Sequence, residues 1–268
     1  MDRIICVVGP TASGKTKLAV QLAKLYDGEV VSCDSMQIYK HMDIGTAKPT
    51  KEEMEGVAHH LIDMVEPGED FSAGKYVQLA DACVQDILSR GKTAVIAGGT
   101  GLYVDSLIAG RSFAPVPQTG RREALEAQLR ETGGEAMLAR LREIDPEAAA
   151  RLHPADEKRV IRALEVYEET GKTITQHNLE TKAVPPRYRP VWIGLDYQDR
   201  AALYRRIDLR VENMLSDGLL DEIRALLALG VSPKTTAMQA IGYKEFFPYF
   251  EGAAPLEACT DKLKQASR

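Results

Sequence analysis

The chain has 268 residues, of which 44% are hydrophobic and 27% charged, as in an ordinary globular protein with one large domain or a domain carrying an insertion. No run approaches the roughly 18 consecutive apolar residues of a membrane helix, and the first residues lead directly into a strand, so we expect no signal peptide and a cytoplasmic protein. The formal net charge of −5 argues against binding nucleic acid by bulk electrostatics, so any nucleic-acid site must be local.

A glycine-rich segment follows the first apolar run. Residues 4–8 (IICVV) predict a buried strand, and Leu18, Leu22 and Leu25 recur afterwards at helical spacing. Between them stands the G-x-x-x-x-G-K-[ST] pattern of a P-loop, in which backbone N–H groups and a lysine bind phosphate and a hydroxyl ligates Mg²⁺. Its residues are Gly9, Pro10, Thr11, Ala12, Ser13, Gly14, Lys15 and Thr16. The segment predicts a diphosphate site with Thr16 as the metal ligand, but it does not distinguish a nucleotide from another diphosphate ester.

Residues 29–33 predict a second strand that ends at Asp34. Ligands of open α/β sheets bind at the carboxyl ends of the strands, so we expect Asp34 to face the same crevice as the P-loop. The alternative is an Asx cap on a loop, a common position for an aspartate followed by serine.

Residues 40–58 show little apolar periodicity and predict a loop with a short helix, and residues 59–65 predict a third strand. His59 and His60 are adjacent on that strand and so point to opposite faces, which disfavours a shared metal. The four cysteines have no C-x-x-C spacing, so we expect neither disulfides nor zinc.

A second glycine-rich turn follows a further strand. Ser72 is expected to begin a helix that ends at Arg90-Gly91, and residues 93–97 predict the strand that leads into Gly98-Gly99-Thr100-Gly101. Glycines permit close backbone approach to a ligand, and Thr100 supplies a hydroxyl at a helix N-terminus. Tight packing of the turn is the alternative. Beside the P-loop and Asp34, the turn is expected to form a third wall of the crevice.

The pattern changes between two proline pairs, Pro115 with Pro117 and Pro185 with Pro186. Residues 121–180 are helical in pattern and contain no strand-like run. We therefore predict an α/β fold: a P-loop NTPase-like parallel sheet core formed by residues 1–114 and 185–268, interrupted by a helical insertion domain at residues 115–184.

One helix of the insertion, from residue 153 to Gly171, carries the basic residues Lys158, Arg159 and Arg162 at neighbouring positions. A solvated helix face, neutralised by nearby glutamates such as Glu165, is the usual interpretation of such charges. From the residues alone we favour that interpretation over nucleic-acid binding.

Strand character returns at residues 191–195, and a helix is expected from Arg200. Arg210 on this helix is the candidate to reach the P-loop and bind a leaving diphosphate bidentately. The alternative is a pair within the helix, with Asp208 or Glu212. The later aromatic cluster, from Phe246 onwards, could stack on bases but is more often core.

Several long motifs stand in order along essentially the whole chain: GPTASGKT at 9–16, DSMQIYKHMDIGTAKP at 34–49, HHLID at 59–63, GGTGLY at 98–103, HPADEKRVIRALEVYEETGK at 153–172 and IGYKEF at 241–246. This set resembles the bacterial tRNA dimethylallyltransferases, also called tRNA isopentenyltransferases. That family transfers the dimethylallyl group from dimethylallyl diphosphate to N6 of the adenosine 3′-adjacent to the anticodon, giving N6-(dimethylallyl)adenosine.

The resemblance assigns roles to the candidate residues. Asp34 would accept the proton of the weakly nucleophilic N6 amine. Lys15, Arg210, the P-loop amides and Thr16 with Mg²⁺ would stabilise the leaving diphosphate, and Thr100 would lie near the transfer site. The P-loop would then serve without a requirement for ATP, although nucleotide or ATP binding stays possible for such a loop.

The resemblance also implies contacts with the tRNA anticodon stem-loop, which reverses the interpretation of the basic helix face. The residues that match such contacts are Asp34, Ser35, Met36, Gln37, Lys158, Arg159, Arg162, Gly242, Tyr243 and Lys244. We expect a monomer that flips the target base out of its stack. Because the family continues beyond residue 268 into a basic and aromatic helix, we expect this chain to be shorter than its relatives.

Three alternatives stay open. A small-molecule kinase would need an arginine-rich lid, and none is apparent. An adenylate isopentenyltransferase would accept a free nucleotide, against which the basic helix argues. A nucleotide-switched RNA-binding protein would have no need of Asp34.

Overall fold

The computed structural model describes residues 1–111, 113 and 119–268. Within these residues no helix combines the length and the apolar character needed to cross a lipid bilayer. Pro115 and Pro117, the expected first hinge, lie outside the described residues.

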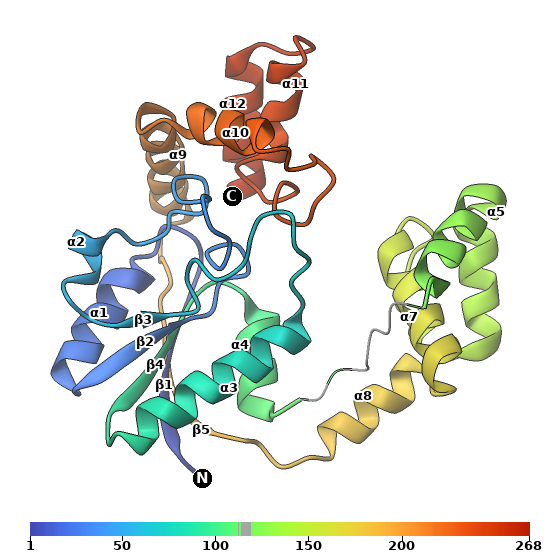
Figure 1. Cartoon of the computed structure of the whole chain (residues 1–268), viewed down its shortest axis with the longest axis horizontal. Coiled ribbons are helices and arrows are strands. Elements are labelled where there is room, and N and C mark those ends of the chain that lie inside the picture. Colours follow the sequence, from blue (N-terminus) through green and yellow to red (C-terminus); the bar gives the residue numbers. More distant parts are fainter. Residues whose placement is uncertain (112, 114–118) are drawn as a thin grey trace. The chain divides into compact units, whose positions relative to one another are not determined.

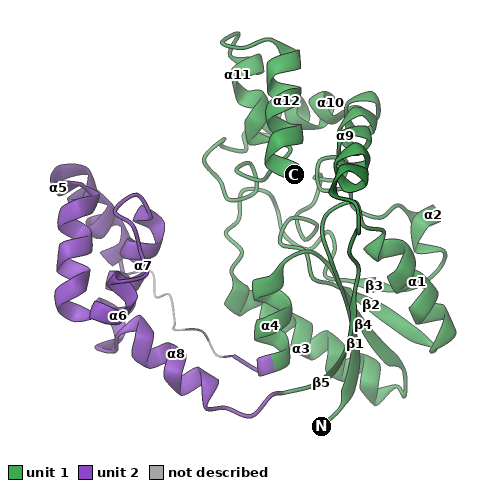
Figure 2. Cartoon of the chain, turned by 180° about the vertical axis from the view of Figure 1, so that it is seen from behind, with its two compact units in different colours: residues 1–108, 187–268 green, residues 109–186 purple. Residues whose placement is uncertain are grey.

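The first of two compact units, residues 1–108 and 187–268, is built on one parallel sheet (Figures 1 and 2). The strand order is β3-β2-β4-β1-β5, and every strand pairing is parallel. The strands are β1 (Arg3–Val8), β2 (Gly28–Ser32), β3 (His59–His60), β4 (Thr93–Ala97) and β5 (Arg189–Gly194). The predicted α/β class with a parallel sheet is confirmed.

Helices cover both faces of the sheet over β1, β2 and β4, whose residues are apolar on both faces, whereas Val191 and Trp192 of the edge strand β5 stay half exposed. One face, carrying Ile4 and Cys6, packs against α3 (Ala73–Ser89) and α4 (Gly101–Ala109). The other face, carrying Val7, packs against α1 (Lys15–Leu25), and Figure 1 shows α1 on the opposite side of the sheet from α3 and α4. This layering leaves the carboxyl ends of the strands as an open edge.

One local prediction was wrong. The third strand ends at His60 instead of residue 65, because Leu61 and Asp63 adopt left-handed backbone conformations with φ of 61° and 56° that cannot continue a strand. In α1, Leu25 is exposed, and the buried residues are Ala19, Val20 and Ala23. Small side chains let this helix approach the sheet closely.

The remaining helices of this unit pack around a second hydrophobic cluster. They are α2 (Lys51–Met54), α9 (Arg200–Ser216), α10 (Leu219–Ala228), the 3₁₀ helix η1 (Lys244–Phe246), α11 (Phe247–Phe250) and α12 (Leu256–Ser267). The cluster joins Ile38, Tyr39 and Met42 to residues of α9, α10 and α12, and Phe246 is fully buried in it. The loop after β2 is therefore packed firmly against C-terminal helices.

The second unit, residues 109–186, is helical in its described part. Its helices are α5 (Arg121–Ile144), α6 (Pro146–Ala149), α7 (Glu157–Thr170) and α8 (Ile174–Lys182). Gly133 kinks α5, with φ of 81° and ψ of 165°. A separate core, including Leu141 and Leu164, holds α5 against α7.

The chain leaves the first unit after Ile108 and returns to it at Arg187. These two residues are adjacent, because the Arg187 N–H donates to the Ile108 carbonyl at 2.8 Å. The Arg187 guanidinium also pairs with Asp81 of α3, 2.8 Å from Nε to Oδ1. The return point is thus fixed to the core from two sides.

Candidate active site

The P-loop between β1 and α1 forms a cradle for an anion. Among the described residues, the N–H groups of residues 11–14 donate to no other group, and the buried Ser13 hydroxyl has no partner. The Lys15 ammonium is held inside the loop by the carbonyls of Gly9 and Pro10, at 3.0 and 2.8 Å. The buried hydroxyl and the neighbouring free N–H groups call for an acceptor, and phosphate oxygens supply one.

Two residues distant in sequence hold the loop in this shape. Ala12 has a left-handed backbone, with φ of 60°, and its carbonyl accepts hydrogen bonds from the Tyr197 hydroxyl at 3.1 Å and from Arg206 Nε at 3.0 Å. Gly9 is pressed against β5's end, where a Cβ would lie 2.6 Å from the Leu195 carbonyl oxygen. Sequence analysis missed Tyr197 and Arg206; the only signal for Arg206 was its position one helical turn before Arg210.

Asp34 lies at the carboxyl end of β2, as predicted. Its Oδ1 accepts the Met36 N–H at 2.9 Å, so the Asx-type turn is present as well. No described residue hydrogen-bonds the other carboxylate oxygen, Oδ2. The carboxylate can therefore keep its own loop in place and still accept a proton.

Thr100 fixes the segment that carries Asp34. The Thr100 hydroxyl accepts the Ser35 N–H at 3.0 Å, and the Thr100 N–H donates to the Cys33 carbonyl at 3.1 Å. Gly98 permits this approach, because a Cβ there would lie 2.1 Å from the Cys33 carbonyl oxygen. The turn is therefore tightly packed, which was the alternative interpretation, and it also supplies the Thr100 hydroxyl.

A cavity of about 470 Å³ lies beside Asp34. Thr11 is the P-loop residue among its lining residues, and the 98–101 turn, expected as a third wall, contributes none of them. The polar wall of the cavity includes Thr11 of the P-loop, Asp34 and Arg210 of α9. Its apolar wall is formed by residues of α9 and α12: Ile207, Val211, Met214 and Leu263. The cavity can thus hold a molecule with one anionic and one hydrocarbon end.

Two partly buried cations, Lys15 of α1 and Arg210 of α9, lie within electrostatic reach of Asp34. Burial lowers the pKa values of both Lys15 and Arg210, while the Asp34 carboxylate raises them. Arg210 has no hydrogen bond or ion pair among the described residues. The alternative partners expected for it are taken, since Asp208 pairs with Arg268 and Glu212 with Lys264. The Glu53 carboxylate raises the pKa of Arg210 as well, but neither cation forms an ion pair with a described residue, which favours a bound anion.

The metal expectation rests on Thr16. Its side chain is half-buried at the start of α1, and no described residue hydrogen-bonds its hydroxyl. No group of three or more His, Cys, Asp or Glu side chains among the described residues could hold a metal ion. A single protein ligand, the Thr16 hydroxyl, suits a Mg²⁺ ion that takes its other ligands from substrate phosphate oxygens and water.

Three further candidate contacts, Ser35, Met36 and Gln37, are partly buried. Ser35 and Met36 line the cavity. Gln37 is turned inward, where its amide donates to the Ala47 carbonyl at 3.2 Å and its Oε1 accepts from the Ser32 hydroxyl.

The 242–244 segment combines buried and exposed residues. Gly242 is buried with φ of 107°, Tyr243 is fully buried, and Lys244 is exposed. The Tyr243 side chain therefore supports the fold from inside, and Lys244 is the member that presents charge to solvent.

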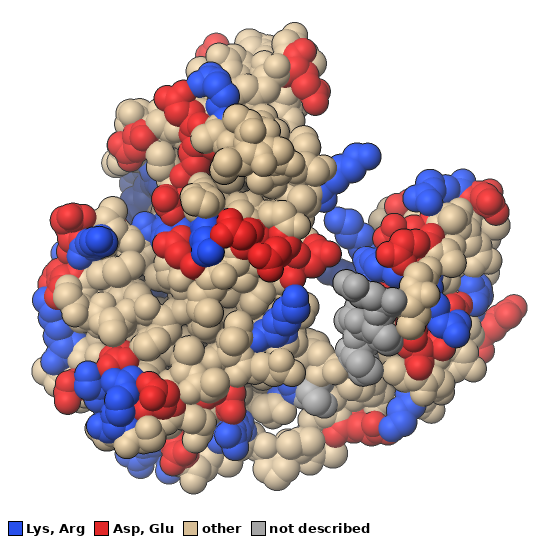
Figure 3. All heavy atoms as spheres, in the orientation of Figure 1, with Lys and Arg blue, Asp and Glu red and all other residues tan. Residues whose placement is uncertain are grey.

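The basic residues of α7 are also not equivalent. Lys158 and Arg159 are exposed and have no recorded partner in the described part of the chain. Arg162 donates to Glu165 at 2.7 Å, and that carboxylate is only 2% exposed. On the face drawn in Figure 3, acidic and basic side chains are interspersed over the helical unit. Any nucleic-acid contact there depends on a few local cations.

Sequence comparison identifies a family and its members. The family model described as IPP transferase matches residues 37–268. A tRNA dimethylallyltransferase of Thermoanaerobacter sp. (strain X514) is 46% identical over 268 residues, covering 99% of this chain and 85% of the relative. One from Roseiflexus castenholzii is 50% identical over 267 residues, covering 98% and 85%.

Solved structures give the same result. A full-length tRNA isopentenylpyrophosphate transferase from Bacillus halodurans superposes with a TM-score of 0.72 at 43% identity, covering 100% of this chain and 83% of that one. A eukaryotic dimethylallyltransferase acting on tRNA gives a TM-score of 0.84 at 31% identity, covering 100% and 67%.

Proposed function

Because the chain belongs to the IPP transferase family, we propose that it is a tRNA dimethylallyltransferase. It transfers the dimethylallyl group of dimethylallyl diphosphate to N6 of the adenosine 3′-adjacent to the anticodon. The observation that carries this proposal is the cavity in which Asp34, Arg210 and the P-loop residue Thr11 meet beside an apolar wall. A kinase would need no hydrocarbon pocket at this position.

The reaction exchanges one bond for another. The N6 lone pair attacks the allylic carbon, the bond from that carbon to the diphosphate oxygen breaks, and the electron pair leaves with inorganic diphosphate. The N6 proton must then be lost. The Oδ2 of Asp34 is the acceptor, since its partner oxygen is already used by the Met36 N–H.

Charge builds up on the departing diphosphate, and stabilising it lowers the barrier. The free N–H groups of residues 11–14, the Ser13 hydroxyl, Lys15 and Arg210 are the donors available for this role. Thr16 would hold Mg²⁺ together with diphosphate oxygens, and the ion would supply further neutralisation of the leaving group. Thr100 acts by fixing Asp34's segment.

The tRNA would be recognised locally. The exposed cations Lys158, Arg159 and Lys244 are the proposed phosphate contacts, and the target base would be flipped out of its stack to reach Asp34. The expected monomeric state and cytoplasmic location stay predictions.

The test is incubation of the protein with isotopically labelled dimethylallyl diphosphate and either tRNA or AMP, with and without Mg²⁺. We expect label in tRNA, dependent on Mg²⁺. Label in AMP alone would indicate an adenylate isopentenyltransferase. Label in neither acceptor would exclude the transferase function.

A further inference from the structure

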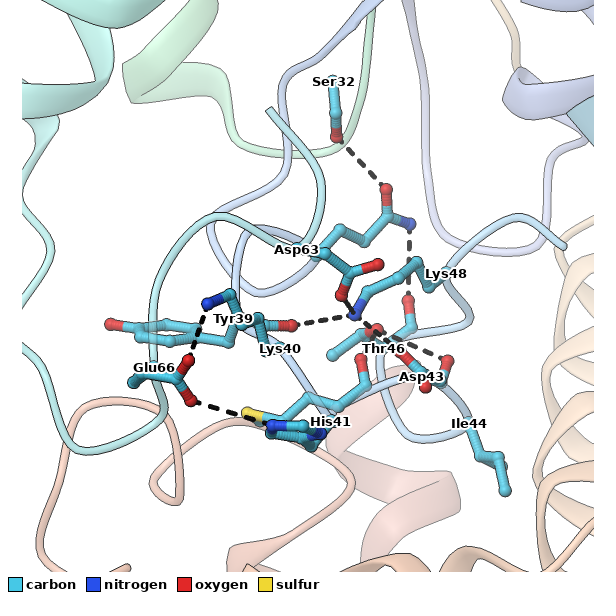
Figure 4. Close-up of polar contacts among 12 residues, drawn as sticks. Ser32, Tyr39, Lys40, His41, Asp43, Ile44, Thr46, Lys48, Asp63 and Glu66 are labelled. Atoms are coloured by element: carbon cyan, nitrogen blue, oxygen red, sulfur yellow. Dashed lines mark hydrogen bonds and ion pairs between the residues drawn. The ribbon is translucent and has the colours of Figure 1, made fainter. Parts of the chain in front are cut away.

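The loop of residues 39–48 forms part of the cavity wall and is closed on itself by a buried lysine. Figure 4 shows the Lys48 ammonium surrounded by the Tyr39 carbonyl and the carboxylates of Asp43 and Asp63. The Lys48 side chain is 5% exposed, and its Nζ lies 2.8 Å from the Tyr39 oxygen. The loop is thus a folded unit.

A second side chain holds this loop from outside. Glu222, in the first turn of α10, accepts the N–H groups of Asp43 and Ile44 on Oε2, both at 2.8 Å. Its Oε1 accepts the Gly45 N–H at 3.1 Å and the Tyr243 hydroxyl at 2.6 Å. Three successive amides directed at one point form an anion-binding nest, and here the anion is a side chain of the same protein.

The hydrogen bonds of Glu222 accompany a close contact between the 43–46 segment and residues 242–243. A Cβ on Gly45 would lie 2.5 Å from the Tyr243 ring, and one on Gly242 would lie 3.2 Å from the Gly45 carbonyl oxygen. Gly45, Thr46 and Gly242 all line the cavity that contains Asp34 and Arg210. The position of this wall therefore depends on the contacts that Glu222 makes.

We propose that Glu222 is a positioning residue for the transfer reaction, which holds the 43–46 segment against residues 242–243 and so sets the shape of the reaction cavity. This inference rests on the proposed function. Without the carboxylate, three neighbouring N–H groups lose their shared acceptor and turn toward water. A displacement of about 1 Å at a reaction site can cost on the order of 100-fold in rate.

The decisive variant is Glu222→Gln, which keeps the shape but replaces one acceptor oxygen with an NH₂ donor that faces other donors. Asp221→Asn is the matched control, because Asp221 stands in the same helical turn, is 81% exposed and pairs with Arg224. Three quantities are compared with the wild type: hydrogen exchange at the amides of residues 43–45, kcat/KM for tRNA, and affinity for inorganic diphosphate.

For Glu222→Gln we expect faster exchange at residues 43–45, a loss of about 10- to 100-fold in kcat/KM, and unchanged diphosphate affinity. Asp221→Asn should match the wild type in all three. Wild-type exchange or wild-type kcat/KM in folded Glu222→Gln would overturn the proposal.

If Glu222→Gln does not fold, Glu222→Asp replaces it, because the shorter carboxylate keeps the charge but cannot reach all three amides. Wild-type exchange and turnover in that variant would equally overturn the proposal. Absence of prenyl transfer by the wild type would refute the proposed function instead, and the exchange measurement would still decide whether Glu222 holds the loop.

Discussion

In the proposed reaction, Asp34 divides its carboxylate between structure and chemistry. Oδ1 accepts the Met36 N–H, and Oδ2 is left for the substrate. The side-chain oxygen of an asparagine can take over the structural bond but cannot accept a proton at neutral pH. The two roles are therefore separable by a single isosteric substitution.

For Asp34→Asn we expect kcat to fall by about 10²- to 10⁴-fold, with affinities for tRNA and diphosphate largely unchanged. Single-turnover transfer of labelled dimethylallyl groups and equilibrium binding of each substrate measure the two effects. Wild-type turnover in this variant would exclude the proton-acceptor role.

A different carboxylate, Glu29, stabilises the opposite end of β2. It is 5% exposed and is bonded by Arg90 at 2.8 Å, Lys92 at 2.9 Å and His60 at 2.8 Å. The Arg90 hydrogen bonds are the largest cause that holds the pKa of Glu29 well below its usual value. A carboxylate with a lowered pKa in the folded state stabilises the protein when the pH is above its pKa in the unfolded chain.

For Glu29→Gln we expect a loss of about 3 kcal/mol in unfolding free energy at pH 7, since the cations Arg90 and Lys92 lose their buried charged partner. The difference from wild type should shrink as the pH falls below about 4.5, where the wild-type unfolded chain takes up the proton. Urea denaturation across pH 3 to 7 measures it. Glu55→Gln, which breaks only an exposed pair with Lys24, should leave the urea midpoint close to that of the wild type.

At the scale of elements, the position of Asp34 depends on how closely the segments after β2 and β4 approach each other. The turn after β4 touches the last residue before Asp34, with Gly98 against the Cys33 carbonyl and Thr100 bonded to Ser35. A side chain on Gly98 would force these segments apart. The Thr100 bond would be lost with them.

Gly98→Ala should destabilise the protein by about 1–3 kcal/mol through overpacking and should also reduce transfer activity. Gly99→Ala is the matched control, because a Cβ there meets nothing within 4 Å. Thermal unfolding of both variants gives the comparison. Equal melting temperatures would show that the strand ends tolerate separation.

The elements that sequence predicted best were those with long or strongly apolar patterns. The strand at residues 93–97 and the helix after Ser72 were predicted almost to the residue, because buried strands and Ser caps have clear local signals. The third strand was overextended, since the left-handed conformations of Leu61 and Asp63 have no marker such as glycine.

At the scale of the whole molecule, charge locates the tRNA contacts poorly. The net charge is −5, and acidic and basic side chains alternate on the viewed face. Binding must therefore rely on a few exposed cations. On α7, Lys158 and Arg159 meet this condition, whereas Arg162 is paired with Glu165.

Replacing Lys158 and Arg159 by alanine should weaken tRNA binding and reduce the slope of log affinity against log salt by about 1–2. Removing Arg151 and Lys172, which are paired with Glu147 and Glu180, takes the same charge from the same unit and should change binding little. Filter binding at several salt concentrations measures both. If the variant and the wild type gave equal slopes, Lys158 and Arg159 would be solvated residues that do not contact tRNA.

Much of the candidate site followed from sequence because its parts end strands. The P-loop has a fixed spacing, and Asp34 follows from the rule that ligands bind at carboxyl ends. Arg206, Tyr197 and Glu222 were not found, because each acts on backbone more than 170 residues away in the chain. Such contacts leave no periodicity or motif to detect.

The hydrogen bond between Arg187 and Ile108 has a consequence for changes in the length of the chain. Because the exit from the core and the return to it are neighbours, the segment between them closes a loop whose ends are already together. The entropic cost of lengthening such a loop grows only slowly with its size. Insertions or deletions within the helical unit should therefore cost little stability in the first unit, which carries the sheet and the reaction cavity.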